Sequence, residues 1–240
     1  MIKEICEHNF LGNLLDENSF VLDLGGNRGE FARRISEDFG CKVLTFEPLR
    51  ELFERIPANN LVQKINKAVG VEDGYLDLSW GRGMDITVVE KSESSIRVPS
   101  VAFTNILKQN GKVDLIKIDI EGEEVQILGA ATPDDLKDVN QMTIEFHDFL
   151  YPELKPRVEK IKAKLESAGF YCIPFSLTNN GDVLFVKKSL ISKTLYFYLK
   201  FIVKFFLAAK RKPGRLYRKY YRMLSGVSRK GERKSANDSG

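Results

Sequence analysis

The sequence predicts an α/β protein with a seven-stranded, mostly parallel sheet, an antiparallel hairpin at its C-terminal end and an amphipathic helical tail. Between residues 19 and 187, apolar runs of strand length alternate with helical patterns, which is typical of a parallel sheet covered by helices. Residues 179–182 read Asn-Asn-Gly-Asp, a hairpin turn that makes the last two strands antiparallel. The 240 residues suffice for one large domain and an appendage.

Each expected strand is a short apolar run, and several expected helices end at residues that break helices. Pro57, Gly111 and Gly169 mark three of these ends. We expect strands at residues 20–24, 42–47, 61–66, 113–118, 141–146, 170–175 and 182–187. We expect helices at residues 3–15, 29–39, 49–57, 102–110, 123–129 and 153–168. Residues 76–101 indicate one or two irregular strands around a charged, glycine-rich loop.

The composition excludes several classes of protein. With 43% hydrophobic and 29% charged residues, the chain is neither collagen-like, nor disulfide-rich, nor wholly disordered. The three cysteines, Cys6, Cys41 and Cys172, lack the spacing of a disulfide framework or a zinc site and indicate cytosolic thiols. The N-terminus has no apolar segment followed by a cleavage site, so we expect a cytoplasmic protein.

Charge divides the chain into a mildly acidic body and a basic tail. Residues 191–240 hold 14 Lys and Arg but 2 Asp and Glu, whereas residues 1–190 carry a net charge of −8. On a helix, one narrow basic stripe would contain Lys193, Lys200, Lys204 and Arg211. Aromatic and aliphatic side chains take the other faces, which is typical of a helix that lies on an anionic membrane surface.

We therefore divide the chain into a globular domain at residues 1–189, a basic amphipathic membrane-binding tail at 190–224 and a disordered end at 225–240. Two other interpretations of the tail stay open. Its apolar face could pack on the body or on a second subunit of a homodimer. A tilted transmembrane helix is the other, although Lys200 and Lys204 would lie near its middle.

A glycine loop directly follows the first strand of the predicted sheet, with the sequence Asp23-Leu24-Gly25-Gly26-Asn27-Arg28-Gly29. A tight strand-to-helix turn exposes backbone N–H groups and lets a ligand approach the main chain. Glu47 ends the next strand, where a carboxylate can accept the hydroxyls of a ribose. The nicotinamide spacing G-x-G-x-x-G does not fit, and Asp23 suits a ligand with an ammonium group and no pyrophosphate, as in S-adenosylmethionine. The alternative is a tight turn without a ligand.

Carboxylates also end two further strands of the predicted sheet. Asp119 and Glu121 follow the strand at 113–118, and Glu145 and His147 lie at the end of its neighbour. Because the carboxyl ends of parallel strands meet at the edge where α/β sheets bind ligands, we expect these four side chains to converge.

These motifs resemble those of the FkbM-type methyltransferases over residues 18–187. The matching segments are Asp-x-Gly-x-Asn-x-Gly at 23–29, Phe-Glu-Pro at 46–48, Asn-x-Ala-Val-Gly at 66–70 and, most specifically, Lys-Ile-Asp-Ile-Glu-Gly-x-Glu at 117–124. The resemblance implies a Rossmann-like fold and transfer of a methyl group from S-adenosylmethionine to a hydroxyl, often on a sugar or polyketide. It places Asp119 and Glu121 beside the methyl-transfer site. The cofactor-binding residues expected from it are Asp23, Gly25, Gly26, Asn27, Gly29, Glu47, Pro48, Ala68 and Asp119.

Transfer to a hydroxyl needs a group that removes its proton. His147, with an ordinary pKa of about 6.5, is the residue type best matched to neutral pH, and Glu145 or Asp119 would orient it. Alternatively, His147 is satisfied by local hydrogen bonds, or it joins Asp119 and Glu145 as a ligand of Mg²⁺ or Mn²⁺. We assign no metal ligand from the sequence, because these residues lack a diagnostic spacing; a divalent metal is allowed but not expected.

Three further expectations concern residues near the predicted site and at the N-terminus. Glu121 and Glu123 could instead cap the following helix. His8 is expected at the surface. The candidates for an acceptor pocket are Trp80, Arg82 and Asp85.

We therefore predict an S-adenosylmethionine-dependent O-methyltransferase that acts on a sugar or glycan precursor. It would bind peripherally to the inner face of the cell membrane. The alternatives are a methyltransferase with another small-molecule acceptor, a non-catalytic nucleotide-binding scaffold, or a nucleic-acid-binding protein that uses the tail. A nucleic-acid partner is not expected, because the basic and aromatic side chains lie on opposite faces instead of interleaving for base stacking.

Overall fold

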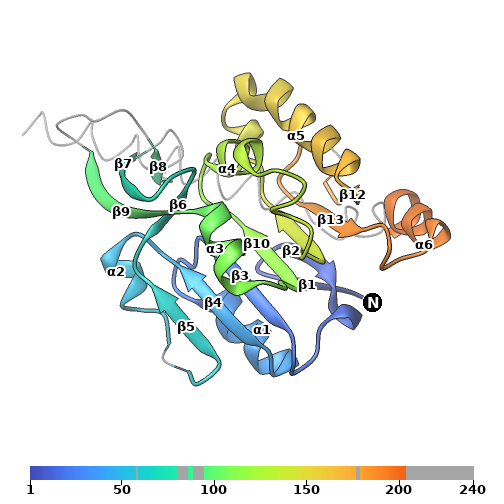
Figure 1. The fold of residues 1–240 in the computed structure, drawn as a ribbon, viewed down its shortest axis with the longest axis horizontal. Coiled ribbons are helices and arrows are strands. Elements are labelled where there is room, and N and C mark those ends of the chain that lie inside the picture. The colour runs from blue at the N-terminus through green and yellow to red at the C-terminus, as the bar shows by residue number, and fades with distance from the viewer. Residues whose placement is uncertain (58, 81–85, 89–94, 177–178, 204–240) are drawn as a thin grey trace, which may run out of the picture.

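A seven-stranded sheet with helices on both faces forms the centre of the molecule (Figure 1). The computed structural model describes residues 1–57, 59–80, 86–88, 95–176 and 179–203. In spatial order the strands are β12 (Phe170–Pro174), β13 (Val183–Lys187), β11 (Gln141–Ile144), β10 (Leu115–Ile118), β3 (Phe20–Leu24), β4 (Lys42–Phe46) and β5 (Val62–Ile65). β13 is antiparallel to both of its neighbours and the other pairs of this sheet are parallel, which confirms the predicted fold class.

The order of the strands reverses beside β3, which lies between β4 and β10. In open α/β sheets, ligands bind at the carboxyl ends of the strands next to such a reversal. The register places Asp23 of β3 between Thr45 of β4 and Lys117 of β10. The glycine loop predicted from the sequence therefore leaves the sheet at its ligand-binding edge.

Side chains of each strand alternate between two apolar layers, as the neighbours Val21 and Leu22 illustrate. The layer that contains Leu22 packs against α3 (Phe103–Asn110), α4 (Glu124–Ala130) and α5 (Lys155–Ser167). The layer that contains Val21 packs against α1 (Glu30–Phe39), the N-terminal residues and the beginning of the tail. Both faces are thus covered, as a mostly parallel sheet requires.

The predicted helix at residues 3–15 is wrong. This segment forms the hairpin of β1 (Ile2–Ile5) and β2 (His8–Leu11), followed by the 3-10 turn η1 (Gly12–Leu14). Cys6 and Glu7 form its two-residue turn, and both have a positive φ, of 50° and 69°. Apolar spacing over so short a segment does not distinguish a buried hairpin from a helix, and the turn residues are not the usual glycine or asparagine.

Polar side chains tie this hairpin to the sheet. The side chain of Asn9 donates a hydrogen bond of 2.6 Å to Asp182. The N–H of Leu11 donates to the side-chain oxygen of Gln141 at 2.9 Å. β2 is buried along its whole length. As a consequence His8, expected at the surface, is 2% exposed.

The region expected to hold irregular strands forms a second, regular sheet, seen on the left of Figure 1. Its strands, in spatial order, are β6 (Ala68–Gly70), β9 (Ile96–Ala102), β7 (Gly74–Trp80) and β8 (Ile86–Val88). The helix predicted at 49–57 is shorter than expected and is α2 (Arg50–Phe53). Residues 54 and 55 continue it only as a turn.

The described part of the tail is helical and packs on the body. It comprises α6 (Lys193–Tyr198) and the π-helical turn η4 (Leu199–Val203). Leu199 is fully buried, and the ring of Tyr196 stacks on Tyr171 of β12 with 4.1 Å between centroids. In the part of the chain that the structure describes, no helix has the length and hydrophobicity to cross a membrane. The expected tail from residue 204 and the end at 225–240 lie outside the described residues.

Candidate functional site

The loop between β3 and α1 presses against the ends of β4 and β10. The N–H groups of Gly25 and Gly26 both donate to the carbonyl oxygen of Phe46, at 3.0 and 2.8 Å. Gly25 has a φ of +85°, and a Cβ atom there would lie 1.9 Å from the carbonyl oxygen of Asp119. The loop therefore requires glycine at position 25, because the main chain of Asp119 occupies the space that a side chain would need.

Glu47 connects this loop to the end of β4. Its two carboxylate oxygens accept hydrogen bonds from the N–H of Asn27 at 2.8 Å and the N–H of Leu49 at 2.9 Å. Burial raises the pKa of Glu47, although these two hydrogen bonds oppose the rise. Each oxygen keeps a second lone pair, so the carboxylate can still accept a ribose hydroxyl, and that role stays a prediction.

Pro48 and Ala68 lie on the adjoining side of the loop. The side chain of Asn66 donates to the carbonyl oxygens of Glu47 and Pro48, at 2.8 and 3.0 Å. Ala68 is buried in β6, in a small apolar cluster against which Leu49 packs. The cofactor-binding role of both residues stays a prediction.

Lys117 lies beneath the glycine loop and is 4% exposed. Its ammonium nitrogen is 3.3 Å from Asp23 and 3.5 Å from Asp119, and it donates to the carbonyl oxygen of Gly25 at 2.5 Å. Burial alone would lower the pKa of Lys117, but the charges of Asp23 and Asp119 outweigh it and raise that pKa. The sequence analysis expected the ammonium group of the ligand to pair with Asp23. In the structure, the ammonium of Lys117 takes that place.

Asp23 is fully buried, and its second oxygen accepts a hydrogen bond of 2.9 Å from the hydroxyl of Thr45. Its carboxylate therefore shapes the loop from below. Direct contact between Asp23 and a ligand stays a prediction.

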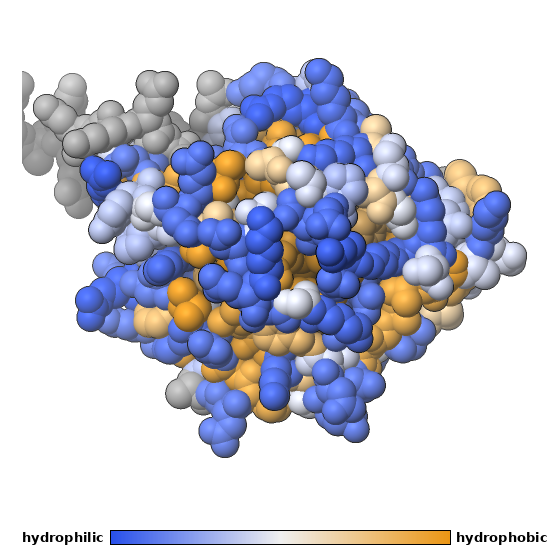
Figure 2. Space-filling view, viewed as in Figure 1, coloured by the Kyte–Doolittle hydropathy of each residue, from blue (hydrophilic) through white to orange (hydrophobic). Residues whose placement is uncertain are grey.

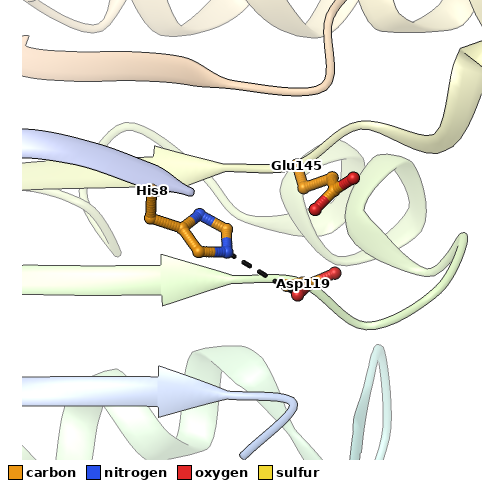
Figure 3. A group of neighbouring side chains, drawn as sticks. All are labelled: His8, Asp119 and Glu145. Atoms are coloured by element: carbon orange, nitrogen blue, oxygen red, sulfur yellow. Dashed lines mark ion pairs between the residues drawn. The ribbon is translucent and has the colours of Figure 1, made fainter. Parts of the chain in front are cut away.

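Asp119 faces two imidazole rings from opposite sides. Its Oδ2 atom lies 3.6 Å from Nε2 of His8, and its Oδ1 atom lies 3.7 Å from Nε2 of His147. Figure 3 shows that His8 reaches Asp119 from the N-terminal hairpin, while Glu145 extends from the end of the neighbouring strand. Partial burial alone would raise the pKa of Asp119, but Lys117 and the two histidines hold it well below its ordinary value.

His147 is held between carboxylates at both ring nitrogens. Nδ1 lies 3.0 Å from Glu124, which is fully buried, and Nε2 lies 3.1 Å from Glu121. Burial alone would lower the pKa of His147, but Glu124 and Glu121 outweigh it and raise it to about 12. The ring is therefore protonated at neutral pH, which argues against the neutral imidazole that a general base requires; the catalytic role of His147 stays a prediction.

Glu124 organises this part of the site, although it was not among the residues predicted for it. Besides facing His147, it accepts hydrogen bonds from the N–H groups of Ile120 and Gly122 at 3.0 and 3.1 Å. Glu121 has a φ of +54°, a costly conformation for a residue with a side chain. The sequence did point to Glu124, because it is the last residue of the motif at 117–124, the most specific of the matching segments.

The segment after β11 also lines a cavity of about 400 Å³. Asp148 belongs to the short 3-10 helix η2 (His147–Phe149), and its Oδ2 atom accepts a hydrogen bond of 2.7 Å from Asn180. Its Oδ1 atom is buried and has no hydrogen-bond partner among the described residues.

The structure brings together most of the residues predicted for the site. Asp23, Gly25, Gly26, Asn27, Glu47, Asp119, Glu121, Glu145 and His147 all lie at the carboxyl edge of β3, β4, β10 and β11. Arg82 and Asp85 lie outside the described residues, as does the side chain of Trp80.

Comparisons with known proteins point to one family. The family model described as "Methyltransferase FkbM domain" matches residues 23–172. A comparison with curated proteins finds no significant match.

The chain is also similar to three solved structures, at low sequence identity. A Streptococcus mutans protein in complex with SAH has 14% identity, covers 73% of this chain and 92% of its own, and has a TM-score of 0.47. An rRNA methylase from Streptococcus thermophilus has 11% identity, coverage of 73% and 90%, and a TM-score of 0.43. Magnesium protoporphyrin IX methyltransferase from Synechocystis with bound SAM has 11% identity, coverage of 74% and 73%, and a TM-score of 0.40.

The close approach of Gly25 to Asp119 yields a first prediction. Gly25→Ala should lower the free energy of unfolding by clearly more than Gly40→Ala, measured by urea denaturation. Gly40 also has a positive φ, of +70°, but its added Cβ would make only ordinary contacts. The Gly40→Ala variant therefore measures only the cost of a positive φ for a residue with a side chain, about 1–2 kcal/mol. Equal losses for the two variants would show that the steric argument is wrong.

The buried ammonium yields a second prediction. Lys117→Met should lower the free energy of unfolding by about 3–5 kcal/mol, because it leaves Asp23 and Asp119 without their cation. Lys112→Met is the control: Lys112 pairs with Asp114 at 2.7 Å but is 69% exposed, so its loss should be below about 1 kcal/mol. Adding Asp23→Asn to Lys117→Met should restore part of the stability; no restoration would contradict the pairing.

Proposed function

This chain belongs to the FkbM family of S-adenosylmethionine-dependent methyltransferases, and on that premise we propose that it methylates a hydroxyl of a sugar or glycan precursor. The observation that carries the proposal is the glycine loop, pressed against Asp119 and tied to Glu47. S-adenosylmethionine supplies an activated methyl group on a sulfonium. The chain's own residues must hold this donor and orient the acceptor oxygen toward the methyl group.

The cofactor-binding residues of the proposal are those at the loop. Gly25, Gly26 and Gly29 let the loop pack tightly against its neighbours in the protein, while Glu47 and Asn27 line the end of β4. Asp23 and Lys117 maintain the loop from below.

The side chains at the carboxyl ends of β10 and β11 suit a methyl acceptor that carries hydroxyl groups. Asp119, Glu121 and Glu145 offer carboxylate oxygens, which accept hydrogen bonds from hydroxyls. Asp148 adds a carboxylate to the lining of a neighbouring cavity. Several acceptor atoms along one edge suit a molecule with several hydroxyls, such as a sugar. We retain His147, Glu145, Asp119 and Glu121 as the candidate catalytic residues.

The third prediction tests cofactor binding and transfer together. The purified full chain should bind S-adenosylmethionine but not NAD in calorimetry, and Glu47→Gln should weaken binding about tenfold because a hydroxyl loses a charged acceptor. Glu51→Gln, at an exposed position of α2, is the control and should bind as the wild type does.

Transfer is measured with donor carrying a deuterated methyl group and a cell-envelope sugar extract, followed by mass spectrometry. We expect a sugar product that is heavier by one labelled methyl group, with the label on a former hydroxyl oxygen. Absence of donor binding, or a label found only on nitrogen or carbon, would overturn the proposed function.

We further propose that the enzyme works at an anionic membrane surface. The tail buries one side on the body, through Leu195, Tyr196 and Leu199. On its other side, Phe197 and Phe201 stack on one another and are 56% and 52% exposed. At the right-hand edge of Figure 2, where α6 lies in Figure 1, residues of hydrophobic (orange) and intermediate (white) hydropathy lie at the surface.

Exposed aromatic side chains next to a basic sequence favour a lipid surface over a second protein as the partner. Tyr198 and Ile202 extend the exposed apolar side, and the chain that follows, residues 204–240, holds 12 Lys and Arg. Apolar groups would enter the acyl region while the cations meet anionic headgroups.

The fourth prediction concerns this surface. The full chain should sediment with vesicles of phosphatidylglycerol and phosphatidylcholine, and less with phosphatidylcholine alone. Phe197→Ser and Phe201→Ser should each weaken binding about tenfold, since each removes a side chain worth roughly 1.5 kcal/mol when buried. Tyr75→Ser, at an exposed aromatic of β7, should bind as the wild type does. Identical sedimentation of all variants would refute the proposed surface.

A further inference from the structure

The carboxylate of Asp119 meets two histidines in the same way. Each imidazole faces it through Nε2, at 3.6 Å for His8 and 3.7 Å for His147. Both separations exceed those of ordinary hydrogen bonds. They match donor atoms that share a cation, because an ion with ligand distances of about 2.1 Å sets its ligands roughly 3.0–4.2 Å apart.

The second ring nitrogen of His147 provides an independent observation. Nδ1 lies 3.0 Å from the fully buried Glu124, and the same carboxylate accepts two backbone N–H groups of the turn. In metal sites, the ligating histidine commonly donates its other N–H to a carboxylate, which fixes the tautomer and directs the free nitrogen to the ion. Glu124 holds His147 in this arrangement.

The two sides of Asp119 differ in charge. Oδ2, which faces His8, is also 3.5 Å from the ammonium of Lys117, and that ammonium would repel a cation. Oδ1 faces His147, whose Nε2 is 3.1 Å from Glu121. The side with His147 therefore offers two carboxylates and one imidazole away from the fixed positive charge.

We propose that Asp119, Glu121 and His147 bind one divalent cation that accepts mixed nitrogen and oxygen ligands and that displaces the proton from Nε2 of His147. Their ligand atoms lie within 4.8 Å of one another. Manganese suits this set, since it favours carboxylate oxygens, which are two of the three proposed ligands. Glu124 acts as a positioning residue for His147, and Glu145 lies close enough to Asp119 to approach the site from the next strand.

The inference rests on the proposed function and gives the ion a role in it. A divalent cation lowers the pKa of a hydroxyl that it contacts, so the acceptor loses its proton more readily, to water or a nearby carboxylate. The acceptor oxygen then forms a bond to the methyl carbon. The S–CH3 bond breaks and its electron pair stays on sulfur, giving the methyl ether and S-adenosylhomocysteine.

The fifth prediction is a binding measurement that does not depend on activity. The full chain, dialysed against a chelator, is titrated with Mn²⁺ while electron paramagnetic resonance follows the free ion. We expect one ion per chain. Glu121→Gln and His147→Gln should each weaken binding at least tenfold, as Glu124→Gln should through its effect on His147. Glu123→Gln, in the same turn but outside the proposed ligand set, is the matched control and should bind as the wild type does.

The outcomes separate this inference from the function on which it rests. Glu121 is partly exposed, so its variant should fold normally, and circular dichroism checks the others. If the protein binds S-adenosylmethionine but no Mn²⁺ at millimolar concentration, or if the ligand variants bind Mn²⁺ as tightly as Glu123→Gln, the metal site is wrong and the methyltransferase stands. If S-adenosylmethionine itself does not bind, the proposed function fails.

Discussion

The ion pairs of Lys117 are the interaction on which the site depends. One buried ammonium contacts the end of β3 through Asp23, the end of β10 through Asp119 and the glycine loop through the carbonyl of Gly25. An isolated charge is costly to bury, so each of these groups needs the others. The loop, the neighbouring strand and the acidic edge are thus held in one arrangement before any ligand arrives.

The strands and loops that could be predicted from the sequence are those that a local pattern of residues specifies. The buried runs at residues 20–24 and 42–47 became β3 and β4 within one residue, because central strands bury both faces and appear as continuous apolar segments. The glycine loop and the acidic motif were located for the same reason, since each directly follows such a strand. Parallel pairing then brings their ends together.

What the sequence did not reveal depends on contacts between distant residues. His8 reaches Asp119 only because its hairpin packs on the sheet, and nothing near His8 in the chain indicates that. Periodicity misread the hairpin as a helix, since Cys6 and Glu7 carry no turn signal. The ordinary pKa of histidine suggested a base, whereas two carboxylates on the ring of His147 reverse that expectation.

The N-terminal hairpin has a consequence for the order of folding. Asn9 bonds to Asp182, a contact across 173 positions of the chain, and closing so long a loop is entropically slow. The hairpin can therefore make all of its polar contacts with the sheet only after residue 182 has been synthesised. The wall of the acidic edge that carries His8 is thus fully secured only near the end of the domain's synthesis.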